Sequence, residues 1–164
     1  MDADMTLRFG SVRVRTTVHW PRAETESLAL VLSEELSPTD AWVEMFVVIG
    51  LVGGHSSAVE LAALQWVSDH VAEFGARRER MLVAGGARAA RLALAARHGG
   101  WPALRGQLLI HPVWGAERPM PSDVGGAPPA TVVCGPRRDG GRRYAERLRA
   151  AGVEVREVRD DGSH

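Results

Sequence analysis

The sequence predicts an α/β fold in which helices flank both faces of a mostly parallel sheet. Short apolar runs alternate along the 164-residue chain with segments whose apolar residues recur at helical spacing. This alternation is typical of parallel strands joined by helical crossovers. Residues 28–32 and 45–49 are continuous apolar runs, which predicts central strands that are covered on both faces. No internal repeat or low-complexity linker divides the chain, so we expect a single domain, residues 1–164.

Residues 1–40 are expected to supply edge strands on the N-terminal side of the sheet. Residues 11–20 alternate apolar and polar side chains, as a half-exposed antiparallel strand does. We expect this strand to pair with residues 6–9 in a hairpin that turns at Gly10.

The most informative stretch is residues 81–90, where a short apolar run passes through Gly85 and Gly86 into an alanine-rich segment. This order predicts a strand, a tight turn and a helix, with Ala87 at the turn and at the carboxyl end of the strand. Hydrolases with a G-x-S-x-G turn hold a nucleophilic serine at this place. An alanine methyl group can neither attack a carbonyl carbon nor give up a proton to a base, so covalent catalysis is not expected here.

Further helices and strands are predicted on both sides of this turn. A glycine stop at Gly75 ends the helix that precedes it. The predicted helices are residues 58–75 and 139–152, and the predicted strands are residues 106–113, 128–135 and 153–158.

In this order, residues 42–164 resemble the catalytic half of the α/β-hydrolases, in particular the hormone-sensitive-lipase-like esterase group. The most specific matches are A-L-Q-W-V in a helix, Q-L-L-I-H-P-V in a strand and Y-A-E-R-L-R-A-A-G-V before the last strand. The resemblance implies a shortened α/β-hydrolase-like fold. Only a Gly/Pro-rich loop joins Val113 to Pro128, and His164 stands where the family continues into a last helix, so the lid and last helix are expected to be missing.

The resemblance also assigns the catalytic positions of the family. The serine falls on Ala87, the acid on Gly135 and the histidine on His164, so the histidine alone is retained. Glu34 and Glu35 stand where the family has its oxyanion loop, and their carboxylates would repel a developing oxyanion. The candidate site residues are therefore His164 as the catalytic base and, for ligand binding, Gly86, Ala87 and Gly135.

These assignments leave three functions open. The leading one is a catalytically silent homologue that binds a small apolar, ester-like ligand, or a partner, beneath Ala87. It leads because loss of a triad serine alone typically costs about a million-fold in turnover. The second is a weak carboxylic ester hydrolase in which His164, oriented by Asp139, activates water. The third is the product of a decayed or truncated esterase gene.

Composition argues against several other classes of protein. Twenty arginines and no lysine are balanced by twenty acidic residues, so we attribute the arginines to coding bias and expect no nucleic-acid binding. The single cysteine, Cys134, is expected to be a buried structural thiol and suits a reducing compartment. The N-terminus lacks a signal-peptide pattern, and no apolar run reaches membrane-spanning length. We therefore expect a cytoplasmic protein with no membrane contact.

The histidines carry no metal-ligand spacing, so we expect neither a metal nor a cofactor. His55 precedes two serines, and we expect Ser56 or Ser57 to cap the next helix with the help of Glu60, rather than to act with His55 in catalysis. His111 is expected to pack at a strand end. The missing covering elements predict exposed apolar surface and, from it, a homodimer or poor solubility.

Overall fold

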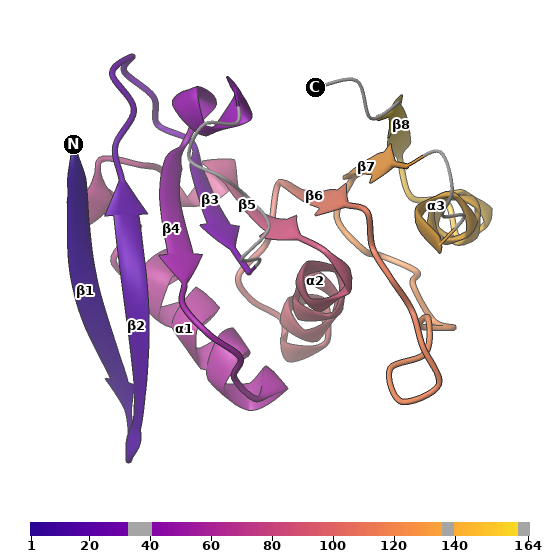
Figure 1. Ribbon diagram of the computed structural model, residues 1–164, viewed down its shortest axis with the longest axis horizontal. Coiled ribbons are helices and arrows are strands. Elements are labelled where there is room, and N and C mark those ends of the chain that lie inside the picture. Colours follow the sequence, from indigo (N-terminus) through magenta and orange to yellow (C-terminus); the bar gives the residue numbers. More distant parts are fainter. Residues whose placement is uncertain (33–40, 136–139, 161–164) are drawn as a thin grey trace.

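The structure is a computed structural model that describes residues 1–32, 41–135 and 140–160. Within these residues, eight strands form one sheet in the order β1-β2-β4-β3-β5-β6-β7-β8 (Figure 1). The strands are β1 (Asp2–Phe9), β2 (Val12–His19), β3 (Leu28–Val31), β4 (Val47–Leu51), β5 (Met81–Gly85), β6 (Gly106–Ile110), β7 (Ala130–Cys134) and β8 (Val155–Arg159). The helices are α1 (Ser57–Asp69), α2 (Ala87–Gly99) and α3 (Gly140–Ala150), with short 3-10 helices η1 (Ala41–Met45), η2 (Val71–Phe74) and η3 (Arg78–Arg80).

The first two strands form the predicted edge hairpin. β1 pairs antiparallel with β2, and Gly10 at their turn has a φ of 62°, which glycine adopts without strain. β2 is antiparallel to β4, and from β4 to β8 every pair of neighbouring strands is parallel. The prediction of a mostly parallel α/β sheet is confirmed.

One face of the sheet carries the larger core, to which α1, α2 and α3 all contribute. Leu30, Ile49, Val83 and Leu109 are fully buried in this core, because side chains alternate along each strand and these four point to the helix side. The opposite side, which we name the second face, holds a smaller apolar cluster without a residue from any described α-helix. The second-face cluster consists of Ala29, Val31 and Ala84, with Phe46, Val48, Leu82 and Leu108 packed against them.

The turn between β5 and α2 has the predicted geometry. β5 ends at Gly85 and α2 begins at Ala87, so Ala87 lies at the carboxyl end of its strand. Gly85 has a φ of 148°, and a Cβ atom there would lie 3.3 Å from both the Ala89 Cβ and the Leu32 carbonyl oxygen. Only glycine therefore allows β3, β5 and α2 to approach so closely at this turn.

Candidate ligand-binding site at the turn between β5 and α2

Ala87 faces a pocket of about 520 Å³ at the carboxyl edge of the sheet, which we name the elbow pocket. Part of its wall is apolar and comes from Leu32, Ile110 and Val113. The other lining residues are Gly54, Gly86, Ala87, Arg88, Arg91, His111 and Arg118. Two of the predicted ligand-binding positions thus lie in one pocket. Its described lining offers no hydroxyl or thiol group for covalent attack.

Gly135, the position assigned to the acid, lies against the ring of His111. A Cβ atom on Gly135 would be 2.9 Å from His111 Nδ1 and 3.0 Å from Cε1, so the imidazole occupies the space that an acidic side chain would need. The Nε2 atom of the same ring lies 3.0 Å from Asp160 Oδ2, and both side chains are about three-quarters buried. The backbone supports this pair, because Asp160 N–H donates to the Cys134 carbonyl at 2.9 Å.

From the sequence, His111 was expected to pack at a strand end, and its contact with Asp160 was not predicted. His111 has a backbone φ of 45°, which is unusual for a residue other than glycine. Its Nε2 is held by Asp160 and its Nδ1 lies beside Gly135, so the pair holds the end of β6 to the end of β8. The signal available in the sequence was that His111 lies near the end of the predicted strand 106–113 and that Asp160 follows the predicted strand 153–158 by two residues. The carboxyl ends of neighbouring parallel strands meet at one edge of a sheet.

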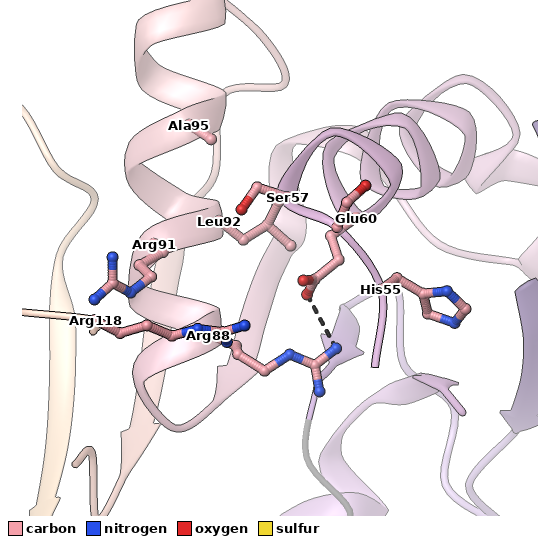
Figure 2. Close-up of a pocket in the computed structure, with 9 residues that line it drawn as sticks. His55, Ser57, Glu60, Arg88, Arg91, Leu92, Ala95 and Arg118 are labelled. Atoms are coloured by element: carbon pink, nitrogen blue, oxygen red, sulfur yellow. Dashed lines mark hydrogen bonds and ion pairs between the residues drawn. The ribbon is translucent and has the colours of Figure 1, made fainter. Parts of the chain in front are cut away.

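A second cavity, of about 260 Å³, shares its arginines with the elbow pocket, and we name it the arginine pocket (Figure 2). Arg88, Arg91 and Arg118 line both pockets. The remaining lining residues are His55, Ser56, Ser57, Glu60, Leu92 and Ala95. The arginine pocket therefore lies between the first turns of α1 and α2, next to Ala87.

Glu60 is a buried carboxylate in the wall of the arginine pocket. Arg88 Nη2 donates to Glu60 Oε2 at 3.2 Å, and Figure 2 shows the two charged groups pointing toward each other. Burial raises the pKa of Glu60 above its ordinary value, and the nearby guanidinium of Arg88 opposes this rise. The charge of Arg88 is thus offset inside the protein.

The start of α1 corrects the predicted role of Glu60. Ser56 is the N-cap and its Oγ accepts a hydrogen bond from Val59 N at 3.3 Å, as one of the two predicted alternatives requires. With Ser56 as the N-cap, Glu60 lies one residue beyond the capping-box position, and its carboxylate binds Arg88 instead. His55 Nε2 lies 3.1 Å from a backbone carbonyl oxygen, so His55 and Ser56 are each engaged in local structure.

Several predicted site residues fall outside the part of the chain that the structure describes. They are His164, Asp139, Glu34 and Glu35. Cys134 is described, and burial raises the pKa of its thiol, which disfavours the thiolate that a nucleophile needs. In the described ranges, no three His, Cys, Asp or Glu side chains gather in a way that could hold a metal ion. Nor is any described helix long and apolar enough to span a bilayer.

The strand order of the sheet and the turn between β5 and α2 are those of an α/β-hydrolase scaffold, and solved structures share this fold. No family model and no curated protein matches the chain. The hyperthermophilic esterase from the archaeon Pyrobaculum calidifontis is 20% identical, with a TM-score of 0.83 over 99% of this chain and 76% of that chain. The carboxylesterase EstE1 from a metagenomic library is 22% identical, with a TM-score of 0.79 over 99% and 79%. An esterase from Pseudomonas putida ECU1011 is 23% identical, with a TM-score of 0.77 over 97% and 72%. This chain therefore has the α/β-hydrolase fold, as the resemblance implied.

Proposed function

We propose that this chain is a non-hydrolytic α/β-hydrolase homologue that binds a small molecule in the elbow pocket. The observation that carries the proposal is Ala87, because it stands at a strand–turn–helix whose geometry is otherwise intact. A scaffold that keeps the turn and the pocket but has no nucleophile can still bind. It cannot form an acyl-enzyme at this residue.

The surroundings of Ala87 support the same conclusion. Losing the triad serine typically costs about a million-fold in turnover, and what remains over water comes from the oxyanion hole and binding. The acid position cannot be refilled without moving His111, because a side chain on Gly135 would meet its ring at 2.9 Å. Two of the three family positions therefore oppose the serine route.

A pocket of this fold can still hold a ligand after a serine has been replaced by alanine. A serine-to-alanine variant of the esterase rPPE, 23% identical to this chain with a TM-score of 0.77, has been solved in complex with (S)-Ac-CPA. We infer by analogy that an alanine at the turn is compatible with ligand binding here. A cytoplasmic location stays part of this proposal and rests on the single cysteine.

The test is the rate at which the purified chain hydrolyses short activated esters. We expect the unmodified protein, His164→Ala and His111→Ala to be equally slow, since neither histidine has a nucleophile to activate. Ala87→Ser alone should recover little, because no acid orients a base for the new serine. Turnover by the unmodified chain that is lost in His164→Ala or in Asp139→Asn would overturn the proposal and establish a weak water-activating hydrolase in its place.

A further inference from the structure

The arginine pocket carries more positive charge than the described residues around it neutralise. Its described lining includes three arginines and one glutamate. The ion pair between Arg88 and Glu60 offsets one of the three positive charges. Those of Arg91 and Arg118 remain, because neither forms an ion pair within the described part of the chain.

The contacts of Arg91 are to uncharged groups. Its Nη2 donates to the Pro119 carbonyl at 2.7 Å, and its guanidinium carbon lies 5.6 Å from the centroid of the Trp114 ring. These contacts fix the direction of the side chain without neutralising it. Its Nε is buried and has no hydrogen-bond partner among the described residues. Arg118 is exposed and its guanidinium makes no hydrogen bond there.

The positions of Arg88 and Arg91 on α2 add to the excess of positive charge at the arginine pocket. Arg88 and Arg91 lie within the first five residues of α2, whose first turn has no acidic residue and whose N-cap Gly86 offers no side-chain acceptor. The N-terminus of a helix carries a partial positive charge, so cations there are unfavourable and an anion is favourable. A bound anion would relieve both the unpaired guanidinium groups and this helix end.

We propose that Arg91 and Arg118 bind the carboxylate or phosphate group of a small anionic molecule whose apolar part lies in the elbow pocket over Ala87. The inference rests on the proposed function, because it names the class of ligand that the non-hydrolytic pocket takes. It replaces the apolar, ester-like ligand expected from the sequence with an anionic one.

The two cavities differ in size and in lining residues, so we assign a different part of the ligand to each. The smaller cavity, of about 260 Å³, is lined by the three arginines, and a planar guanidinium group can donate two parallel hydrogen bonds to two oxygens of a carboxylate or phosphate. The larger cavity, of about 520 Å³, has apolar wall at Leu32, Ile110 and Val113. Because both cavities share the arginines, one molecule can place its charged group in the first and its apolar chain in the second. An organic acid should therefore bind better than its neutral ester.

The experiment compares hexanoate, its methyl ester and inorganic phosphate by ligand-observed NMR titration at constant ionic strength. We expect hexanoate to bind at least about tenfold more tightly than methyl hexanoate, and phosphate to compete with hexanoate. Arg118→Ala should weaken hexanoate by about tenfold or more, and Arg118→Lys should weaken it less, since it keeps the charge but loses the planar fork. Arg143→Ala is the matched control, because Arg143 is also exposed and lies on α3 away from both pockets.

Two outcomes would overturn the inference. One is that methyl hexanoate binds as tightly as hexanoate, and the other is that Arg118→Ala changes the affinity for hexanoate no more than Arg143→Ala does. The side chain of Arg118 is exposed and makes no hydrogen bond or ion pair with the described residues, so its substitution should leave the fold intact, which a thermal unfolding curve verifies. Hydrolysis of methyl hexanoate would instead contradict the proposed function while leaving the affinity for hexanoate measurable. The two failures are therefore distinguishable.

Discussion

Gly135 has no side chain, and the imidazole ring of His111 occupies the space that a side chain there would need. The ring of His111 fills the volume that a side chain at position 135 would enter, and Asp160 contacts the ring from the other side. An acidic residue at position 135 and a histidine at position 111 in this conformation therefore exclude each other. The absence of a side chain at position 135 is therefore coupled to the contact between His111 and Asp160, which joins the ends of β6 and β8.

This coupling predicts a measurable non-additivity. Gly135→Ala should lower the free energy of unfolding by about 1–3 kcal/mol, the usual cost of overpacking, because the new Cβ would meet Nδ1 of His111. In a His111→Ala background the same substitution should cost only a few tenths of a kcal/mol, since the obstructing ring is gone. Urea unfolding of the four proteins in this double-mutant cycle measures the difference. Equal costs in both backgrounds would show that the ring does not occupy this space.

Glu60 predicts a pH dependence whose sign follows from burial. Because burial raises its pKa in the folded protein, the folded state holds this proton more tightly than the unfolded chain does. Its contribution to stability is therefore fully present below the unfolded pKa and is lost as the pH rises through the folded pKa. Glu60→Gln cannot titrate, so its unfolding free energy should improve relative to the unmodified protein as the pH rises from about 4 to 7. A constant difference over this range, measured by denaturant unfolding, would contradict the assignment.

The residues that could be predicted are those whose role follows from the chain on either side of them. Ala87 was placed at its turn because a strand and a helix adjoin it directly in the sequence. His111 and Asp160 are 49 residues apart, and no local pattern joins them. The arginine pocket was missed for another reason: composition alone explained twenty arginines as coding bias, and only the fold shows which of them lie together.

At the scale of single elements, the start of α1 offers a direct test of capping. Ser56→Ala should cost about 1 kcal/mol of unfolding free energy, because Val59 N–H loses its acceptor, and Ser56→Gly should cost less. Ser57→Ala is the control, since Ser57 is the first helical residue and alanine is well tolerated there. If Ser57→Ala costs as much as Ser56→Ala, the cap is misassigned. Thermal or urea unfolding distinguishes the two outcomes.

The helix predicted over residues 58–75 is in fact two helices, and the reason lies at His70. The Nδ1 atom of His70 bonds the Trp66 carbonyl at 2.7 Å, and its ring stacks on Trp66 with centroids 4.0 Å apart. This contact ends α1, and η2 follows with Val71 and Phe74 still buried. The apolar spacing therefore continues past the break, which is why periodicity showed one helix. Gly75, in the left-handed conformation, ends η2 as the sequence predicted it would end the helix.

At the scale of the molecule, the parallel topology was predictable because each apolar run is separated from the next by a crossover segment. The order in which the strands lie side by side was not predicted from the sequence, because it depends on contacts between segments that are far apart in the chain. Composition and periodicity also could not show how the faces are shared. The described α-helices all build the larger core, and the second face carries small residues such as Ala29 and Ala84 beside larger, partly buried ones such as Leu82 and Leu108.

We predict that two copies of the chain associate through the second face. Val132 points to the larger core, so its neighbour Val133 points to the second face. Val158 on β8 pairs with Val133 and therefore lies on the same face. Val158 is 37% exposed, so it extends the apolar surface of the second face to the edge of the sheet. Apolar surface of this kind favours association. Val158→Arg should weaken a homodimer by placing a charge at this surface.

Val12→Arg is the matched control, because Val12 is 36% exposed on β2, beside the turn of the edge hairpin. Sedimentation velocity over a range of concentrations should show a dimer for the unmodified protein and for Val12→Arg, and a shift to monomer for Val158→Arg. An unmodified chain that stays monomeric at high concentration would refute the prediction of a homodimer. A dimer that survives Val158→Arg would refute the choice of face, because a charge buried in an apolar interface without a partner costs several kcal/mol of association free energy, or roughly 10²-fold or more in affinity.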